Sequence, residues 1–200
     1  MASLNKSTTT LKAITAVAAD AQSLSSAKDV SGVSDASVFV NYAPDHASAK
    51  VGAGTKFTLQ ASEAASGNDN WRDMFSFHSG IGAPATHAVD GTVNAGDQTI
   101  LESSTGSLVV EDMVFFKNGT LANSEWATVV KVTANTSFVL QDPLTRAQTG
   151  ATWFGGAMHW TFPLNVSSFL RIRVACNNNV GTTNRAINWS SSCSTADSLS

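Results

Sequence analysis

Charged residues are scarce in this sequence. Asp, Glu, Lys and Arg make up 14% of its 200 residues, whereas a typical globular domain has about 25%. The net charge is −3 at pH 7, and no run of the chain is dense in Lys or Arg. We therefore expect no nucleic-acid binding driven by phosphate neutralisation. A surface poor in charge is instead typical of a protein that lies against other protein.

Cysteines are almost absent, since Cys176 and Cys193 are the only two. They could form one disulfide, but we favour two separate thiols in a reducing compartment, and a disulfide-dense secreted scaffold is excluded. No apolar stretch approaches the roughly 20 residues that span a bilayer, so no membrane association is expected. Residues 11–23 imitate a signal peptide only weakly, because the short apolar run ends at Asp20.

Signatures of catalysis are missing as well. The four histidines are His46, His78, His87 and His159. Their spacing does not match helical zinc ligands, and the sequence has neither a Gly-x-Ser-x-Gly elbow nor a phosphate-binding loop with its lysine. Asp45 and His46 could act as a dyad only beside a nucleophile that the sequence does not identify. We therefore expect that the chain is not an enzyme and has no cofactor and no metal site.

Three carboxylates stand out in residues 109–132, which read VVEDMVFFKNGTLANSEWATVVKV. Glu111 and Asp112 lie between two apolar runs, and Glu125 begins the next β-like run. A glycosidase needs two carboxylates facing each other across a cleft, whereas neighbours in an extended chain point to opposite faces. Acidic residues are also common in turns, where they bind the local backbone. We predict that these carboxylates mark turns and that Glu125 caps a loop.

The tryptophans allow two interpretations. They are Trp71, Trp126, Trp153, Trp160 and Trp189. Each lies at or near the end of a different predicted strand, which favours packing in the core and between domains. An exposed platform for carbohydrate is the alternative.

The first and last thirds of the chain alternate with a period of two, which is typical of β-strands with one buried face. Strands are predicted at residues 36–42, 56–62, 71–79, 157–165, 168–177 and 185–191. In the segment KFTLQAS, Phe57, Leu59 and Ala61 share one face. In the segment SFLRIRVACN, one face carries Leu170, Ile172, Val174 and Cys176, and the other carries Arg171 and Arg173. Residues 36–84 and 157–200 are therefore predicted to form a β-sandwich, Ig-like or jelly-roll in type.

The middle of the chain has a different sequence pattern. Residues 85–156 contain turn signals at Asp90-Gly91, Gly96-Asp97 and Ser104–Gly106, with short β-forming runs between them. Five short strands within about 65 residues favour a small closed barrel, because closure removes exposed edges. We predict that this barrel is inserted into one loop of the sandwich, which makes the fold all-β.

The N-terminal residues 1–35 are polar and small. We predict a short helix over Thr10–Ala21, which alone would be marginal because a dozen residues rarely offset the cost of nucleation. One stripe of this helix would carry Leu11, Ile14, Val17 and Ala18. The segment is either a flexible terminus or an arm that becomes ordered on a neighbouring subunit.

Two parts of the sequence resemble tailed-phage virion proteins. The stretches GDQTILESSTGSLVVEDMVFFKNGTLANSEWATVVKV and NTSFVLQDPLTRAQTGATWF resemble an SH3-like small-barrel module common in such proteins. The flanking stretches DVSGVSDASVFVNYAPDHASAKVGAGTKFTLQAS and FLRIRVACNNNVGTTNRAINW are similar to the Ig-like or jelly-roll sandwich of the same group. The resemblance covers roughly residues 28–200 and includes no short diagnostic motif.

The resemblance implies a capsid decoration or cement protein, made in the host cytoplasm and located on the capsid surface of the virion. Such a protein binds the assembled shell at symmetry axes, associates with itself there, and joins neighbouring subunits of the major capsid protein. It has no catalytic residues to carry over. The candidate capsid contacts are Leu11, Ile14, Val17, Leu24, Val30 and Val33. A tail or neck adaptor and a glycan-binding host-attachment module are the alternatives.

Overall fold

The structure, a computed structural model, describes residues 6–18, 21–44, 55–67, 70–78, 86–148, 150–178 and 186–197. In this part of the chain the fold is all-β, as predicted, and its one helical element is a 3-10 turn, η1 (Leu121–Asn123). The strands are β1 (Lys6–Val17), β2 (Gln22–Leu24), β3 (Lys28–Asp29), β4 (Val33–Pro44), β5 (Lys56–Ser62), β6 (Trp71–His78), β7 (Thr86–Ala88), β8 (Thr99–Leu101), β9 (Met113–Lys117), β10 (Glu125–Thr133), β11 (Ser137–Leu140), β12 (Thr152–Asn165), β13 (Arg171–Asn177) and β14 (Ile187–Asp197).

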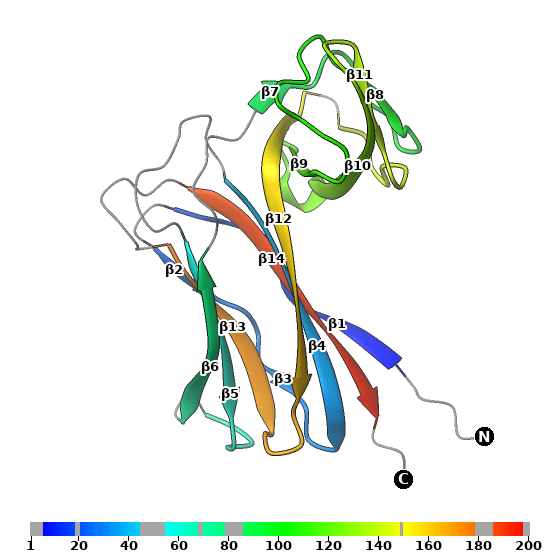
Figure 1. The fold of residues 1–200 in the computed structure, drawn as a ribbon. Coiled ribbons are helices and arrows are strands. Elements are labelled where there is room, and N and C mark those ends of the chain that lie inside the picture. Colours follow the sequence, from blue (N-terminus) through cyan, green and yellow to red (C-terminus); the bar gives the residue numbers. More distant parts are fainter. Residues whose placement is uncertain are drawn as a thin grey trace, which may run out of the picture.

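Two sheets face each other in the lower part of Figure 1. One contains β1, β14, β4 and the second half of β12 in that order, and the other contains β2, β13, β5 and β6, with β3 also on β13. Every strand pair is antiparallel. We call this part, the described residues of 6–78 and 157–197, the two-sheet region.

The core of the two-sheet region follows from the alternation in its strands. On β13 the side chains of Ile172, Val174 and Cys176 are buried, and on β5 Phe57 and Leu59 are buried, as predicted. These side chains meet a second layer from the large sheet, which supplies Val38, Val40, Tyr42, Trp189 and Cys193. Cys176 and Cys193 are both buried and are not joined in a disulfide.

The N-terminal helix prediction is wrong, because residues 10–17 belong to β1. This strand pairs with β14 from Lys6↔Ala196 to Val17↔Ile187. Its β-branched threonine, isoleucine and valine residues suit a strand, and the pairing buries Leu11 and Val17 in the core of the two-sheet region. Within the expected arm, residues 6–17 therefore form the edge strand of the large sheet, and β2 and β3 pair with β13 in the other sheet.

The large sheet continues past β12 and curls strongly. Its order there is β12, β9, β10, β11 and β8, with β7 also on β12. In Figure 1 these strands wrap around a separate core beside one end of the two-sheet region. That core is centred on Phe116, Phe138 and Trp153. We call residues 86–156 the curled region, and the long strand β12 runs from it into the two-sheet region without a break.

A small third cluster fills the junction between the two regions. Ala43 and Ala157 come from the sheet, Phe115 and Phe154 come from the curled region, and Trp126 packs against them. Asn188 of β14 pairs with Ala43 in this part of the sheet and is fully buried. The junction is thus a packed contact that holds the curled region over one face of the large sheet.

Candidate functional site

The carboxylates of Asp112 and Glu125 organise loops, as predicted. The Asp112 carboxylate accepts a hydrogen bond from the Val109 backbone N–H at 2.8 Å, and Glu111 has a positive φ of 76° in the same turn. The Glu125 carboxylate accepts hydrogen bonds from the backbone N–H groups of Thr145 (2.8 Å) and Arg146 (2.7 Å). Glu125 therefore caps the loop between β11 and β12.

His159 is held by hydrogen bonds in the sheet. Its Nδ1 lies 2.6 Å from Asn41 Oδ1, and its Nε2 lies 2.9 Å from Thr161 Oγ1. Burial lowers the pKa of His159, which favours the neutral ring. Since the amide oxygen only accepts, Nδ1 donates to Asn41 and Nε2 accepts from Thr161. His46 lies outside the described residues.

The other candidates for chemistry do not gather into a constellation. His87 packs on Trp153 with ring centroids 5.1 Å apart. In the part of the chain that the structure describes, no three residues among His, Cys, Asp and Glu are placed to hold a metal ion. No helix described there is long and apolar enough to cross a membrane.

Most tryptophans pack as predicted. Trp153 and Trp189 are fully buried, one in each core, and Trp126 lies at the junction. Trp71 lies under two guanidinium groups, those of Arg171 at 5.0 Å and Arg173 at 4.1 Å from its ring centre. These four indoles therefore lie in separate surroundings and do not share one exposed platform.

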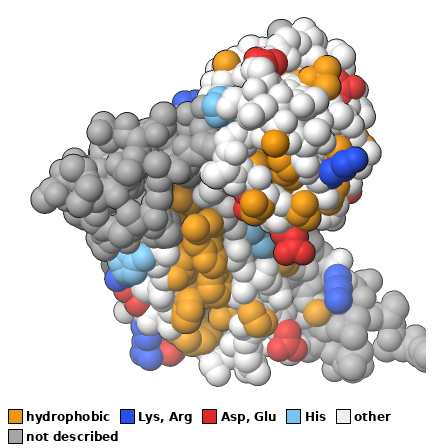
Figure 2. All heavy atoms as spheres, turned by 45° about the horizontal axis from the view of Figure 1, so that its top comes forward, with side chains coloured by type: hydrophobic (Ala, Val, Ile, Leu, Met, Phe, Trp, Pro, Cys, Tyr) orange, Lys and Arg blue, Asp and Glu red, His pale blue; other side chains and the backbone are white. Residues whose placement is uncertain are grey.

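A row of aromatic rings lies between β6 and β12. Phe75 and Phe77 of β6 meet Trp160 and Phe162 of β12. The ring centroids are 5.1 Å apart for Phe75 and Phe162, 4.9 Å for Phe77 and Phe162, and 4.6 Å for Phe77 and Trp160. Figure 2 shows a band of hydrophobic side chains on the two-sheet region. We call these four rings the aromatic stripe.

The stripe is partly exposed because both sheets end there: Phe75 lies open to solvent, whereas the other three rings are half-buried against the core. Among the described strands, β6 pairs only with β5, and residues 158–165 of β12 pair only with β4. Phe75 is 49% exposed, and its neighbour Met74 is 45% exposed. Natural proteins usually protect such edges with charge or proline; here Pro163 lies on the β12 edge and Arg72 and Asp73 lie on β6, whereas residues 74–77 of β6 contain neither. A contiguous apolar surface at two open strand edges is typical of a protein-binding site.

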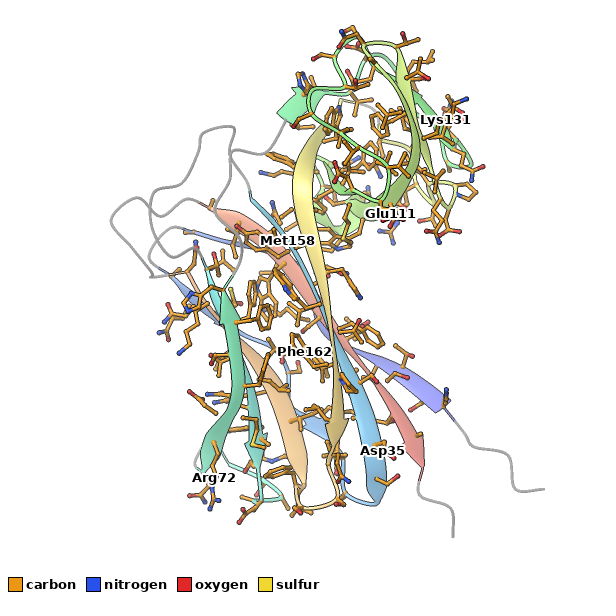
Figure 3. All side chains as sticks on the ribbon, viewed as in Figure 1. Asp35, Arg72, Glu111, Lys131, Met158 and Phe162 are labelled. Atoms are coloured by element: carbon orange, nitrogen blue, oxygen red, sulfur yellow. The ribbon has the colours of Figure 1, made fainter. Side chains whose placement is uncertain are left out.

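The stripe continues into a crevice under the curled region. This crevice has a volume of about 610 Å³, and Met113, Met158 and Trp160 contribute to its walls. Glu111 and Asp112 line the same crevice from the curled region. Figure 3 shows Phe162 and Met158 following one another along β12 toward Glu111. The surface therefore has an apolar floor and an acidic end.

The six predicted capsid contacts are dispersed over the two-sheet region. Leu11, Val17 and Val30 are buried in its core, while Ile14 and Val33 are half-buried and Leu24 is 47% exposed. Contact of these residues with a capsid stays a prediction. For the three core side chains it would require this part of the chain to change conformation.

Sequence reasoning missed the aromatic stripe and one buried carboxylate. The sequence spacing of two placed Phe75 and Phe77 on one face of a strand, and it did the same for Trp160 and Phe162. No local sequence pattern indicated that these two strands lie opposite each other at open sheet edges. The missed carboxylate is Glu102, which is 2% exposed and accepts a hydrogen bond from Trp153 Nε1 at 2.7 Å. Burial raises the pKa of Glu102.

Comparisons with known proteins give distant likenesses only. No family model matches the sequence, and no curated protein matches it. The SPBc2 prophage-derived protein YomS is similar at 6% identity and a TM-score of 0.33, over 98% of this chain and 97% of that one. VP17, a capsid protein of bacteriophage P23-77, is similar at 9% identity and a TM-score of 0.20, over 98% of each chain. At such values the likeness decides nothing about function.

Proposed function

We propose that this chain is a structural protein of a phage virion that binds the assembled capsid and joins neighbouring capsid subunits. In this proposal it is a decoration or cement protein and not an enzyme. The two-sheet region is its β-sandwich, and the curled region is an inserted SH3-like small barrel. Self-association around the capsid symmetry axes belongs to the same proposal. The sequence resemblance supports the class of protein, and the aromatic stripe is the observation that carries the binding role.

The stripe can supply the binding energy. Covering the exposed part of one large apolar side chain stabilises a complex by about 1 kcal/mol, so the aromatic stripe provides a modest affinity per copy. Multiple copies held by capsid symmetry strengthen that affinity by avidity. A protein that binds only the assembled shell also stabilises the shell by mass action. Modest individual contacts are thus sufficient for a cement protein.

The test is binding of purified protein to shells of the phage that encodes it, measured by co-sedimentation. Phe75→Ser and Phe162→Ser should each weaken binding about fivefold per contact, because each removes a ring from the stripe. Leu101→Ser is the matched control, since Leu101 is an apolar side chain 66% exposed on the curled region. This control should bind like the unchanged protein.

Two results would contradict the proposal. The first is unchanged shell binding by both phenylalanine variants when circular dichroism shows them folded. The second is no binding to heads together with binding to purified tails, which would favour the alternative role as a tail or neck adaptor.

A further inference from the structure

A second surface feature lies on the β1 side of the junction. It is a cleft of about 460 Å³ between the outer face of the large sheet and the curled region. The sheet contributes Thr10, Asn41, Ser190 and Ser192 to its lining, and the curled region contributes Trp126 and Arg146. The volume lies within the range of about 300–1,000 Å³ that small-molecule sites occupy.

Arg146 is held in place by the loop that carries it. The Glu125 carboxylate accepts hydrogen bonds from the Arg146 backbone N–H at 2.7 Å and from Gln148 Nε2 at 3.0 Å. The Arg146 side chain donates through Nη1 to the backbone oxygen of Ala122. This single bond leaves several of the five guanidinium N–H donors for a ligand.

No carboxylate neutralises that guanidinium within the described residues. The ion pair found there joins Arg72 and Glu63, at 3.3 Å, and the described residues that line the cleft include no Asp or Glu. Lys12 also lines the cleft, and its ammonium donates one hydrogen bond, to the Leu24 backbone oxygen at 3.0 Å, so it adds positive charge there. Arg146 is the group whose forked geometry matches a carboxylate.

The rest of the lining suits a ring with hydroxyl groups. The indole of Trp126 packs against Phe115 in a tilted arrangement, with ring centroids 4.3 Å apart, and offers an apolar surface. In the same lining, the Asn41 amide nitrogen lies 3.5 Å from the Ser190 hydroxyl, and the Asn41 amide oxygen accepts a hydrogen bond from His159 at 2.6 Å. Hydroxyl and amide groups both donate and accept hydrogen bonds, so they match sugar hydroxyls.

We propose that this cleft binds an acidic sugar of one or two units. Its carboxylate binds Arg146, one face of its ring packs on Trp126, and its hydroxyls bind Asn41 and Ser190. An acidic peptide would also satisfy Arg146 and could hydrogen-bond to the polar floor through its backbone, but the apolar face of Trp126 beside polar groups favours a sugar ring, and the experiment separates the two. The site is separate from the aromatic stripe, so it stands whether or not the chain binds a capsid.

The experiment is an NMR titration of the full chain with three acidic sugars and a neutral match for each. Glucuronate is compared with glucose, galacturonate with galactose, and N-acetylneuraminate with N-acetylmannosamine. At least one acidic sugar should shift the Trp126 indole and the backbone amide of Arg146, and should bind at least fivefold more tightly than its neutral match. Arg146→Gln should remove that preference, whereas Lys131→Gln, at an exposed position of β10, should keep it.

The proposal is overturned if none of the three acidic sugars shifts Trp126 at 20 mM. It is also overturned if acid and neutral match bind equally, or if Arg146→Gln keeps the preference. Shifts caused by a polyglutamate peptide but by none of the sugars would assign the cleft to acidic peptide instead. Arg146→Lys keeps the positive charge and loses the forked geometry. It should fold like the unchanged protein and bind the acidic sugar more weakly, which separates an effect on recognition from an effect on folding.

Discussion

Both regions of this molecule bury a tryptophan in a core, but the two-sheet region also leaves phenylalanine rings at an open edge. In the curled region Trp153 is fully buried, and its indole N–H is bound by Glu102. In the two-sheet region Phe75 and Phe77 lie at an open side, against rings of β12. Curling encloses a core within one sheet, whereas two flatter sheets enclose a core only between them and leave it open where both end. The open side is where we expect a partner.

The regions also differ in how their strands come together. The curled region is one continuous segment, residues 86–156, and its hairpins join strands close in sequence. In the two-sheet region, β1 pairs with β14 from the other end of the chain. Contacts between distant segments require more loop closure before they stabilise the fold. The curled region is therefore the part that we expect to form first.

The largest expected effect comes from removing a core tryptophan in either region. Trp153→Ala and Trp189→Ala should each lower the free energy of unfolding by about 3–5 kcal/mol, because each leaves a large cavity. Hydrogen exchange followed by NMR should show faster exchange mainly in residues 86–156 for the first variant and mainly outside them for the second. If each variant lost protection from hydrogen exchange equally in both regions, the two regions would not act as separate cores.

A smaller loss is expected from the N-terminal strand. Leu11→Ala should lower the free energy of unfolding by about 2–5 kcal/mol, because Leu11 is buried in the two-sheet core. Leu24→Ala is the matched control from the same part of the chain, and its exposed side chain should change stability by about 0.5 kcal/mol or less. Urea titration measures both values. If Leu11→Ala matched the control, β1 would not be part of the stable sheet.

The buried carboxylate of the curled region makes stability depend on pH. Burial raises the pKa of Glu102 above its ordinary value of 4.5, so the folded state binds the proton more tightly than the unfolded state. The free energy of unfolding contributed by Glu102 is therefore complete below the ordinary pKa and is lost as pH rises through the raised one. Glu102→Gln should remove this decline in urea titrations between pH 4 and pH 8. An identical pH profile for both proteins would contradict the assignment.

The smallest effects on stability are expected at the stripe itself. Phe75→Ser should lower the free energy of unfolding by about 1 kcal/mol or less, because half of the ring is already exposed. Leu101→Ser on the curled region should change it by about 0.5 kcal/mol or less. Thermal unfolding of the two variants provides the comparison. A loss of more than about 3 kcal/mol in Phe75→Ser would make the ring part of the core instead of a binding surface.

Local pattern predicted much of this fold. Alternation placed Ile172, Val174 and Phe57 in the core, and the turn chemistry of Asp112 and Glu125 was predicted from their positions between β-like runs. The helix prediction for the N-terminus failed because Leu11 and Val17 suit a helical stripe as well as a strand. The pairing with β14, at the other end of the chain, decided between them. Such pairing, like the meeting of β6 with β12, depends on contacts between distant segments that no local spacing records.

The most direct test of the proposed function is the number of copies per particle. Virions of the phage that encodes this chain would be purified and their proteins quantified by mass spectrometry against the major capsid protein. Hundreds of copies in a simple ratio to the capsid protein are the result that the decoration proposal predicts. A dozen copies or fewer would place the protein in the neck or tail, and its absence from particles would contradict a virion role.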